Sequence, residues 1–153
     1  EGAILDLHLH DVDWALYALG KPRRLTATGL TGRTGAIDDV TALWEYEGTT
    51  VTLRGSWMYQ GFCMSFQALF EQAALDFGMH PDPALRLLRS GVAPERVPLA
   101  PDSGYVRELR YFLECVRGDH ANTVAPAEST RDSVRLVEWE RQAIRSGRWL
   151  TPR

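Results

Sequence analysis

The stretch EGAILDLHLHDVDWALYALG, residues 1–20, decides the fold because it fits two incompatible secondary structures. With a period of two residues its leucines alternate with polar side chains, as in a strand that carries Asp6, His8 and His10 on one face. At about 100° per residue the apolar side chains form one stripe of a helix, and Asp6, His10 and Asp13 line up beside it. The two structures bring different side chains together, so they lead to different chemistry.

A glycine followed closely by a proline favours the helix. Gly20 and Pro22 stand where the apolar stripe ends, and this order is typical of a helix C-terminus. A strand would have to stop near Asp11 and give way at once to a second short helix, with no turn residue between them. The sequence therefore predicts one helix from about Ala3 to Leu19.

The composition describes one folded domain without a strong charge. The chain has 153 residues, 44% of them hydrophobic and 24% charged, and its net charge of -3 offers no basic field for nucleic acid or an anionic membrane. Cys63 and Cys115 lie in apolar segments without CxxC spacing, so they are predicted to be reduced core thiols of a cytoplasmic protein. No membrane span or export leader is recognisable. A first residue Glu1 in place of Met predicts a piece of a longer protein.

Alternating segments after the first helix predict an antiparallel sheet. The segments are residues 24–31, 39–46, 50–57, 62–71 and 74–77. A turn at Glu47 and Gly48 joins the second segment to the third as a hairpin. Four or five antiparallel strands in succession are predicted to form one large sheet.

Two further helices complete an α+β pattern with helices on one face of a large, mostly antiparallel sheet. A proline-rich connection over residues 79–104 is predicted to be irregular, apart from an apolar turn at 85–88. Helical spacing predicts helices over residues 105–116 and 126–147, and the tail at 148–152 fits an edge strand. The uncovered sheet face is predicted to contact another subunit in a homodimer or homotetramer. The alternative is that a layer of loops or an absent domain covers this face.

Asp6 and His10 are the strongest candidates for chemistry. On a helix they lie one turn apart, so both can reach one small molecule, or the carboxylate can orient the imidazole. Such a pair suits proton transfer to or from a hydroxyl, because an imidazole titrates near neutral pH. The alternative is an ordinary solvent-facing polar stripe. His8 is interpreted as a packed core side chain, and His80 and His120 as solvated loop residues.

The strand interpretation leads to a metal-dependent hydrolase. DLHLH, residues 6–10, would then look like the Asp-x-His-x-His strand of the amidohydrolases, with His8 and His10 as ligands of a divalent metal. That chemistry needs further ligands from later strands and a barrel of roughly 250 residues. Neither is present, and no glycine-rich phosphate loop occurs in the sequence.

The first stretch and the order of elements resemble the C-terminal half of the Gfo/Idh/MocA family, named for glucose-fructose oxidoreductase, inositol dehydrogenase and rhizopine catabolism. Its members open this half with a helix of the form Gly-x-x-x-Asp-x-Gly-x-His-x-x-Asp. Gly2, Asp6, His10 and Asp13 fall on that pattern, whereas His8 stands where many members have glycine. The segments that look like the family's final two helices are residues 105–118 and 124–147.

The resemblance implies that residues 1–153 form a single substrate-binding and oligomerisation domain of dihydrodipicolinate-reductase-like fold. It implies an NAD(P)-dependent oxidoreductase that transfers a hydride between NAD or NADP and a sugar- or polyol-like hydroxyl or carbonyl, without a metal. His10 would be the acid/base partner of the reacting oxygen, Asp6 would orient His10 and bind a substrate hydroxyl, and Asp13 would bind substrate.

The same resemblance implies that half of the active site lies outside this sequence. The family's catalytic lysine, in a Glu-Lys-Pro segment, and the pyrophosphate site belong to an N-terminal Rossmann domain that this sequence lacks. The isolated domain is therefore expected to be inactive. A non-catalytic ligand-binding or dimerisation module remains the alternative.

Overall fold

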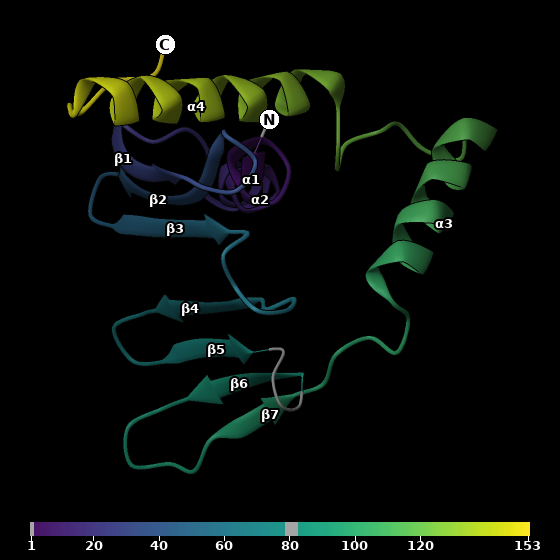
Figure 1. Cartoon of the computed structure of the whole chain (residues 1–153). Helices are drawn as coiled ribbons and strands as arrows, with labels where there is room; N and C mark the ends of the chain where they lie inside the picture. The colour runs from purple at the N-terminus through teal and green to yellow at the C-terminus, as the bar shows by residue number, and fades with distance from the viewer. Residues whose placement is uncertain (1, 79–82) are drawn as a thin grey trace. The chain divides into compact units, whose positions relative to one another are not determined.

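The computed structural model describes residues 2–78 and 83–153 (Figure 1). By its internal contacts the chain divides into two compact units. Unit 1 comprises Glu1–Met58 and Asn122–Arg153, and unit 2 comprises Tyr59–Ala121. Unit 1 thus joins two segments that are far apart in the sequence, whereas unit 2 is continuous.

The first stretch of unit 1 is helical, as its spacing predicts, but the helix is interrupted. α1 spans Gly2–Leu5 and α2 spans His8–Leu19, with Asp6 and Leu7 in a turn between them. The His10 amide donates to the Leu7 carbonyl, three residues back, at 3.3 Å. The prediction of one continuous helix is therefore wrong at this junction, where the regular helical bond from the Leu7 amide to the Ala3 carbonyl is followed by this tighter bond.

Unit 1 contains a three-stranded antiparallel sheet in the order β1-β2-β3. Its strands are β1 (Arg24–Thr31), β2 (Ile37–Glu45) and β3 (Thr50–Ser56), so the predicted first strand and hairpin are confirmed. Alternate side chains of β2 are fully buried, namely Val40, Ala42 and Trp44. The residues between them are only partly buried, so one face of this sheet carries the core.

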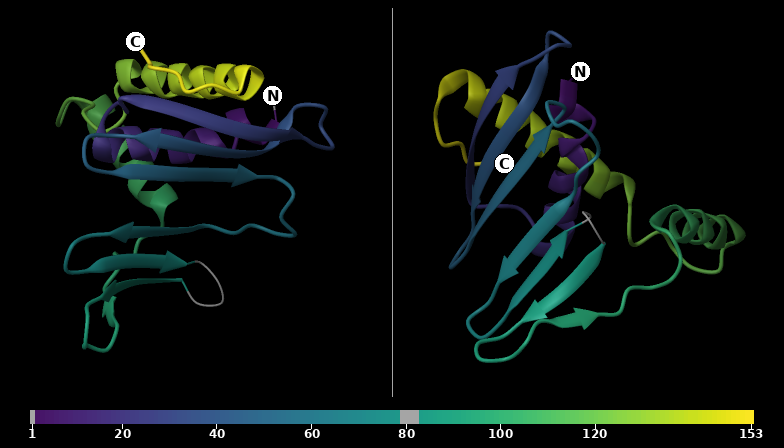
Figure 2. Two further views of the ribbon diagram at one scale, coloured as in Figure 1. Left: turned by 90° about the vertical axis from the view of Figure 1, so that its left-hand side faces the viewer. Right: turned by 60° about the horizontal axis from the view of Figure 1, so that its bottom comes forward.

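Helices cover the core face of this sheet. α4 (Ala127–Ser146) contacts β1 and α2, α1 contacts β2, and α2 contacts β3 (Figure 2). α4 follows Pro126 and ends at Gly147, as predicted. In place of the predicted edge strand, Leu150 forms an isolated bridge with Leu25.

Two glycines allow the first stretch to approach the sheet. A Cβ added to Gly2, whose φ is +70°, would stand 2.5 Å from the Ile37 carbonyl oxygen. A Cβ added to Gly55 of β3 would stand 2.7 Å from the Cβ of His8. Any larger residue at either position would separate the helices from the sheet.

Unit 2 contains a second antiparallel sheet, in the order β4-β5-β6-β7. Its strands are β4 (Ser65–Leu69), β5 (Ala74–Gly78), β6 (Ala84–Leu88) and β7 (Glu95–Val97). The α+β antiparallel class is confirmed, but the strands form two hydrogen-bonded sheets where the sequence predicts one. The predicted irregular connection is wrong over β6 and β7, because its prolines flank these strands and leave their pairing intact.

α3 (Gly104–Arg117) is confirmed as a helix of unit 2, and none of its residues is buried. The Ser103 side chain accepts from the Val106 amide at its start, and Gly118 ends it with a φ of 82°. Its exposed apolar side chains are Tyr105, Val106, Leu109, Phe112, Leu113 and Val116.

The core location predicted for the cysteines is wrong. Cys63 is exposed and Cys115 is half-buried, and neither forms a disulfide. Among the described residues, no helix combines the length and the apolar composition of a membrane span.

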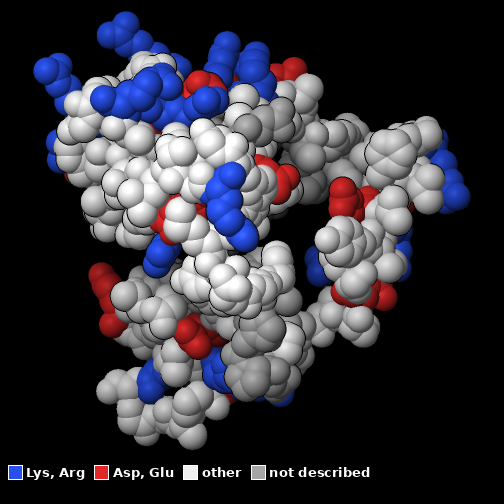
Figure 3. All heavy atoms as spheres, in the orientation of Figure 1, with Lys and Arg blue, Asp and Glu red and all other residues white. Residues whose placement is uncertain are grey.

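Basic side chains gather over α4 in the space-filling view (Figure 3). Three of the arginines on α4 are paired, since Arg131 and Arg135 both contact Asp132 and Arg141 contacts Glu138 at 3.0 Å.

Candidate functional site

The residues predicted to act in a site lie around the junction of α1 and α2. Asp6 is in the turn itself, and His10 and Asp13 are in the first part of α2. All three side chains are exposed, whereas His8, between Asp6 and His10, is fully buried. Helical spacing therefore separates the exposed stripe from the buried histidine as the sequence predicts.

Asp6 and His10 do not bind each other. Within residues 2–78 and 83–153 neither side chain has a hydrogen bond or an ion pair. Both residues are exposed. Asp13 differs, because its Oδ1 accepts a hydrogen bond of 2.6 Å from the Ser133 hydroxyl of α4.

Asp11 is a candidate that the sequence analysis missed. It lies half-buried in the first turn of α2. Burial raises the pKa of the Asp11 carboxyl, while the positive potential of His8 and His10 opposes this shift. Asp11 directly follows His10 in the sequence. It does not belong to the stripe of Asp6, His10 and Asp13, which contains every third or fourth residue.

A buried polar cluster lies beneath this surface, formed by His8, Trp44 and Glu140. His8 Nε2 lies 2.8 Å from Glu140 Oε2, and Trp44 Nε1 donates to Glu140 Oε1 at 2.8 Å. All three side chains are fully buried. The cluster joins α2, β2 and α4, so it ties the start of α2 to the rest of unit 1.

Glu140 could not be paired with His8 from the sequence because 131 residues stand between them. The available signal was a carboxylate within the apolar stripe of α4, at helical spacing from Leu136 and Ala143, which are both buried. A buried carboxylate needs hydrogen-bond donors, and His8 and Trp44 supply one to each oxygen.

These positions overturn the hydrolase hypothesis built on His8 and His10. The stretch is helical, and His8 is occupied by Glu140 in the core while His10 faces solvent. The two imidazoles therefore cannot share one metal ion. Across the described part of the chain, no group of three or more suitable side chains is placed to hold a metal.

Asp38 holds the loop before β2 against the start of α1. Its buried carboxylate accepts from the Thr34 amide at 2.9 Å and from the Thr34 hydroxyl at 2.6 Å. The hydroxyl of Thr34 is the main cause that lowers the pKa of Asp38, and the Ala3 amide adds to it. The site is thereby supported at α1 as well as at α2.

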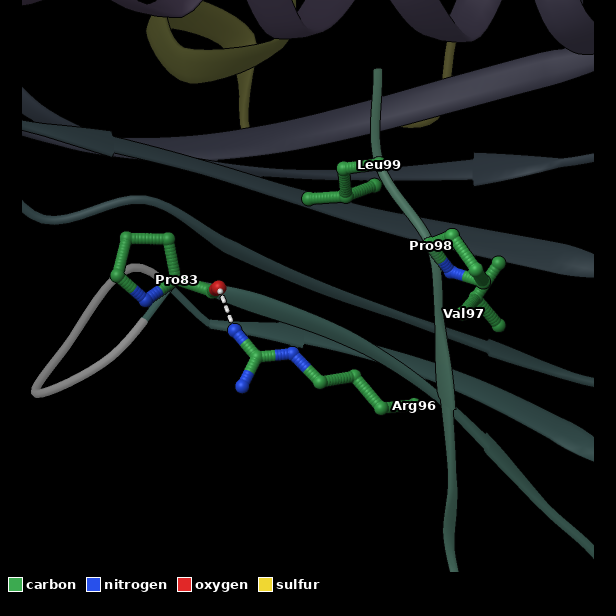
Figure 4. A pocket seen from close by; sticks show the side chains of 5 residues that line it. All are labelled: Pro83, Arg96, Val97, Pro98 and Leu99. Atoms are coloured by element: carbon green, nitrogen blue, oxygen red, sulfur yellow. Dashed lines mark hydrogen bonds between the residues drawn. The ribbon is translucent and has the colours of Figure 1, made fainter. Parts of the chain in front are cut away.

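Unit 2 contains a pocket of about 320 Å³ lined by Pro83, Arg96, Val97, Pro98 and Leu99 (Figure 4). The Arg96 guanidinium donates to the Pro83 carbonyl at 3.2 Å. None of the residues predicted to act in a site lines this pocket. Apart from Arg96, which is already hydrogen-bonded to Pro83, the lining residues are apolar. The pocket therefore contains no side chain suited to acid/base chemistry.

His120 is exposed, as predicted, but it is not isolated. Its Nε2 lies 3.3 Å from a Glu114 carboxylate oxygen, and its Nδ1 lies 3.5 Å from the Cys115 sulfur. The Glu114 carboxylate raises the pKa of His120. His80 lies outside the described residues.

Comparison with known proteins agrees with the motif of the first stretch. Residues 1–76 match the family model described as GFO/IDH/MocA C-terminal domain. The chain belongs to this family, as the resemblance indicates, and corresponds to its C-terminal domain. No curated protein sequence matches the chain.

Similar folds occur in solved structures of oxidoreductases. UDP-N-acetylglucosamine 3-dehydrogenase GnnA from Acidithiobacillus ferrooxidans is 20% identical with a TM-score of 0.80, over 94% of this chain and 47% of that chain. Aldose-aldose oxidoreductase from Caulobacter crescentus, complexed with glycerol, is 18% identical with a TM-score of 0.80, over 98% and 47%. Levoglucosan dehydrogenase, in complex with NADH and levoglucosan, is 14% identical with a TM-score of 0.83, over 100% and 51%. The chain spans about half the length of these structures.

Proposed function

We propose that this chain is the substrate-side domain of an NAD(P)-dependent oxidoreductase acting on a CH–OH group of a sugar- or polyol-like molecule. The observation that carries the proposal is the exposed pair Asp6 and His10 on the family's helix motif, with neither side chain engaged among the described residues. The names of the similar structures, which include sugar dehydrogenases, support the substrate class.

His10 is the proposed acid/base group. When the substrate is oxidised, the imidazole accepts the hydroxyl proton while the hydride on the same carbon leaves, and reduction returns that proton. A bound nicotinamide supplies the hydride acceptor. The Asp6 carboxylate accepts a hydrogen bond from a second substrate hydroxyl and stabilises the imidazolium. Asp13 keeps Oδ2 for a further hydroxyl, since Oδ1 is bound by Ser133.

The cofactor is proposed to be NAD or NADP, held mainly by residues outside this chain. A dinucleotide needs a glycine-rich turn at a helix N-terminus, and the sequence contains no G-x-G-x-x-G segment. The residues present fit only the substrate side of the nicotinamide. The unpaired thiols of Cys63 and Cys115 support a cytoplasmic location.

The test uses the full native chain that contains this domain. Turnover is measured by nicotinamide absorbance with inositol, glucose, levoglucosan and UDP-N-acetylglucosamine, each with NAD and NADP. His10→Ala should lower turnover by about two to four orders of magnitude. Cofactor affinity should stay near that of the wild type. Unchanged turnover in His10→Ala on an accepted substrate would refute the assignment.

Assembly into a homodimer or homotetramer is a second proposed role. It is favoured by the apolar side chains that unit 2 exposes, including Leu69 at the end of β4, Phe70 directly after it and Leu109 on α3. Analytical ultracentrifugation of the wild type should give a dimer or tetramer. Leu69→Lys should shift it to the monomer, whereas a monomeric wild type would exclude this role.

A further inference from the structure

His8 is the residue at which the candidate site meets the core of unit 1. It is the first residue of α2, and the turn at Asp6 and Leu7 immediately precedes it. Its imidazole is fully buried and is bound to Glu140 at 2.8 Å. Three elements therefore fix its position, because Trp44 of β2 holds the other oxygen of Glu140 on α4.

The backbone at His8 is fixed from a second side. Gly55 of β3 leaves no room for a Cβ, which would lie 2.7 Å from the Cβ and 3.1 Å from the Cα of His8. The start of α2 thus lies directly on the strand. The hydrogen bond to Glu140 and the close contact with Gly55 together restrict the position of His8 and of the turn before it.

The site residues themselves have no such anchors. The Asp6 and His10 side chains bind nothing within the described ranges, so their placement depends on the backbone that carries them. His8 lies two residues from each of them. Errors of about 1 Å in the placement of reacting groups can cost on the order of 100-fold in rate.

The hydrogen bonds also assign the proton on His8. An indole N–H can only donate, so Glu140 Oε1 accepts from Trp44. With the carboxylate ionised, Oε2 accepts as well, and Nε2 of His8 must carry a proton. Nδ1 is buried without a hydrogen-bond partner among the described residues.

We propose that His8 is a positioning residue of the site, held through Nε2–H by Glu140 so that the α1–α2 turn presents Asp6 and His10 to the same ligand. This inference rests on the proposed function. It assigns to the buried hydrogen bond between His8 and Glu140 a role in turnover besides its role in stability.

Glu140→Gln tests the proposal with almost no change of shape. The amide oxygen must accept from Trp44, so the amide nitrogen faces His8 and forces Nε2 to become an acceptor. Nitrogen-15 shifts of His8 should therefore show a protonated Nε2 in the wild type and the Nδ1–H tautomer in the variant. In the full native chain, kcat should fall about 10- to 100-fold while the KM for cofactor is unchanged.

Glu138→Gln is the matched control on the same helix, because Glu138 is 47% exposed and pairs only at the surface with Arg141. It should keep wild-type kcat. The nitrogen-15 measurement on the wild type alone can already overturn the proposal, because the proposal requires a protonated Nε2. This test does not depend on whether any variant folds. Wild-type kcat in a folded Glu140→Gln protein, while His10→Ala is inactive, would overturn it and leave the proposed function standing. Full activity of His10→Ala would refute the proposed function instead.

Conservative variants at His8 give an independent measurement. His8→Gln can donate from its amide nitrogen to Glu140, whereas His8→Leu fills a similar space without a donor. Turnover should be largely retained in the first variant and lost about 10- to 100-fold in the second, when both are measured below their unfolding temperatures. Equal turnover in the two variants would contradict the proposal.

Discussion

Unit 1 and unit 2 bury their side chains very differently. The core of unit 1 includes Ile4, Trp44 and Leu136, and it also encloses the polar side chains of His8 and Glu140. In unit 2, Ala84 is the sole fully buried hydrophobic side chain among the described residues. Unit 1 is therefore stabilised by its own core, whereas unit 2 leaves apolar side chains exposed.

Truncating one leucine in each unit should give the largest contrast. Leu136 is 2% exposed and Leu109 is 62% exposed. Leu136→Ala should lower the free energy of unfolding by about 2 to 5 kcal/mol because it leaves a cavity in the core. Leu109→Ala should lower it by less than about 0.5 kcal/mol. Urea denaturation measures both, and equal losses would show that the units are packed alike.

Removing one hydrogen-bond donor from the buried cluster should have the next largest effect. Trp44→Phe leaves Glu140 Oε1 without its donor and should cost about 1 to 3 kcal/mol of unfolding free energy. The matched control is Trp149→Phe, since Trp149 is 39% exposed and its ring lies against the Arg24 guanidinium. A control as damaging as Trp44→Phe would argue against a special role for the buried donor.

Acid should weaken unit 1 through Asp38. Because its folded pKa lies below the ordinary value of 3.8, its contribution is fully present above that pH and is lost as the pH falls through the folded pKa. The melting temperature of the wild type should therefore fall toward that of Asp38→Asn as the solution is acidified. A gap between the two proteins that stays constant into strong acid would exclude this mechanism.

Unit 2 should show the opposite pH dependence, with the smallest effect. His120 has a folded pKa above 6.5, so its ion pair with Glu114 is present below that pH and is lost as the pH rises through the folded pKa. Glu114→Gln should move the pKa of His120 toward its ordinary value in a proton NMR titration. Since both groups are exposed, the melting temperature should hardly change, and an unaltered pKa would disprove the pairing.

Local patterns in the sequence predicted what depends on local geometry. The helical stripe of Asp6 and His10, the hairpin of β2 and β3, and the ends of α4 all follow from periodicity and from glycine or proline at element ends. Local patterns did not predict the turn at Leu7. This turn lies next to His8, where α2 packs against Gly55 of β3.

The sequence did not show which strands or side chains that are distant in the chain pair with each other. Alternation shows that a segment is a strand but does not name its partner, so two sheets were merged into one. The prolines near β6 suggested an irregular segment. No proline takes part in the pairing of β6 with β5, so the strand forms in spite of them. Glu140 was passed over because its partners His8 and Trp44 are distant in the chain.

We propose that Asp6 and His10 act together as half of an active site. A double-mutant cycle in the full native chain tests it most directly, with kcat measured for Asp6→Asn, His10→Asn and the double variant. If the two residues act as a unit, the double variant should be no slower than His10→Asn within about threefold. Losses in kcat that multiply would show that the two side chains act independently, and would rule out a joint role for Asp6 and His10.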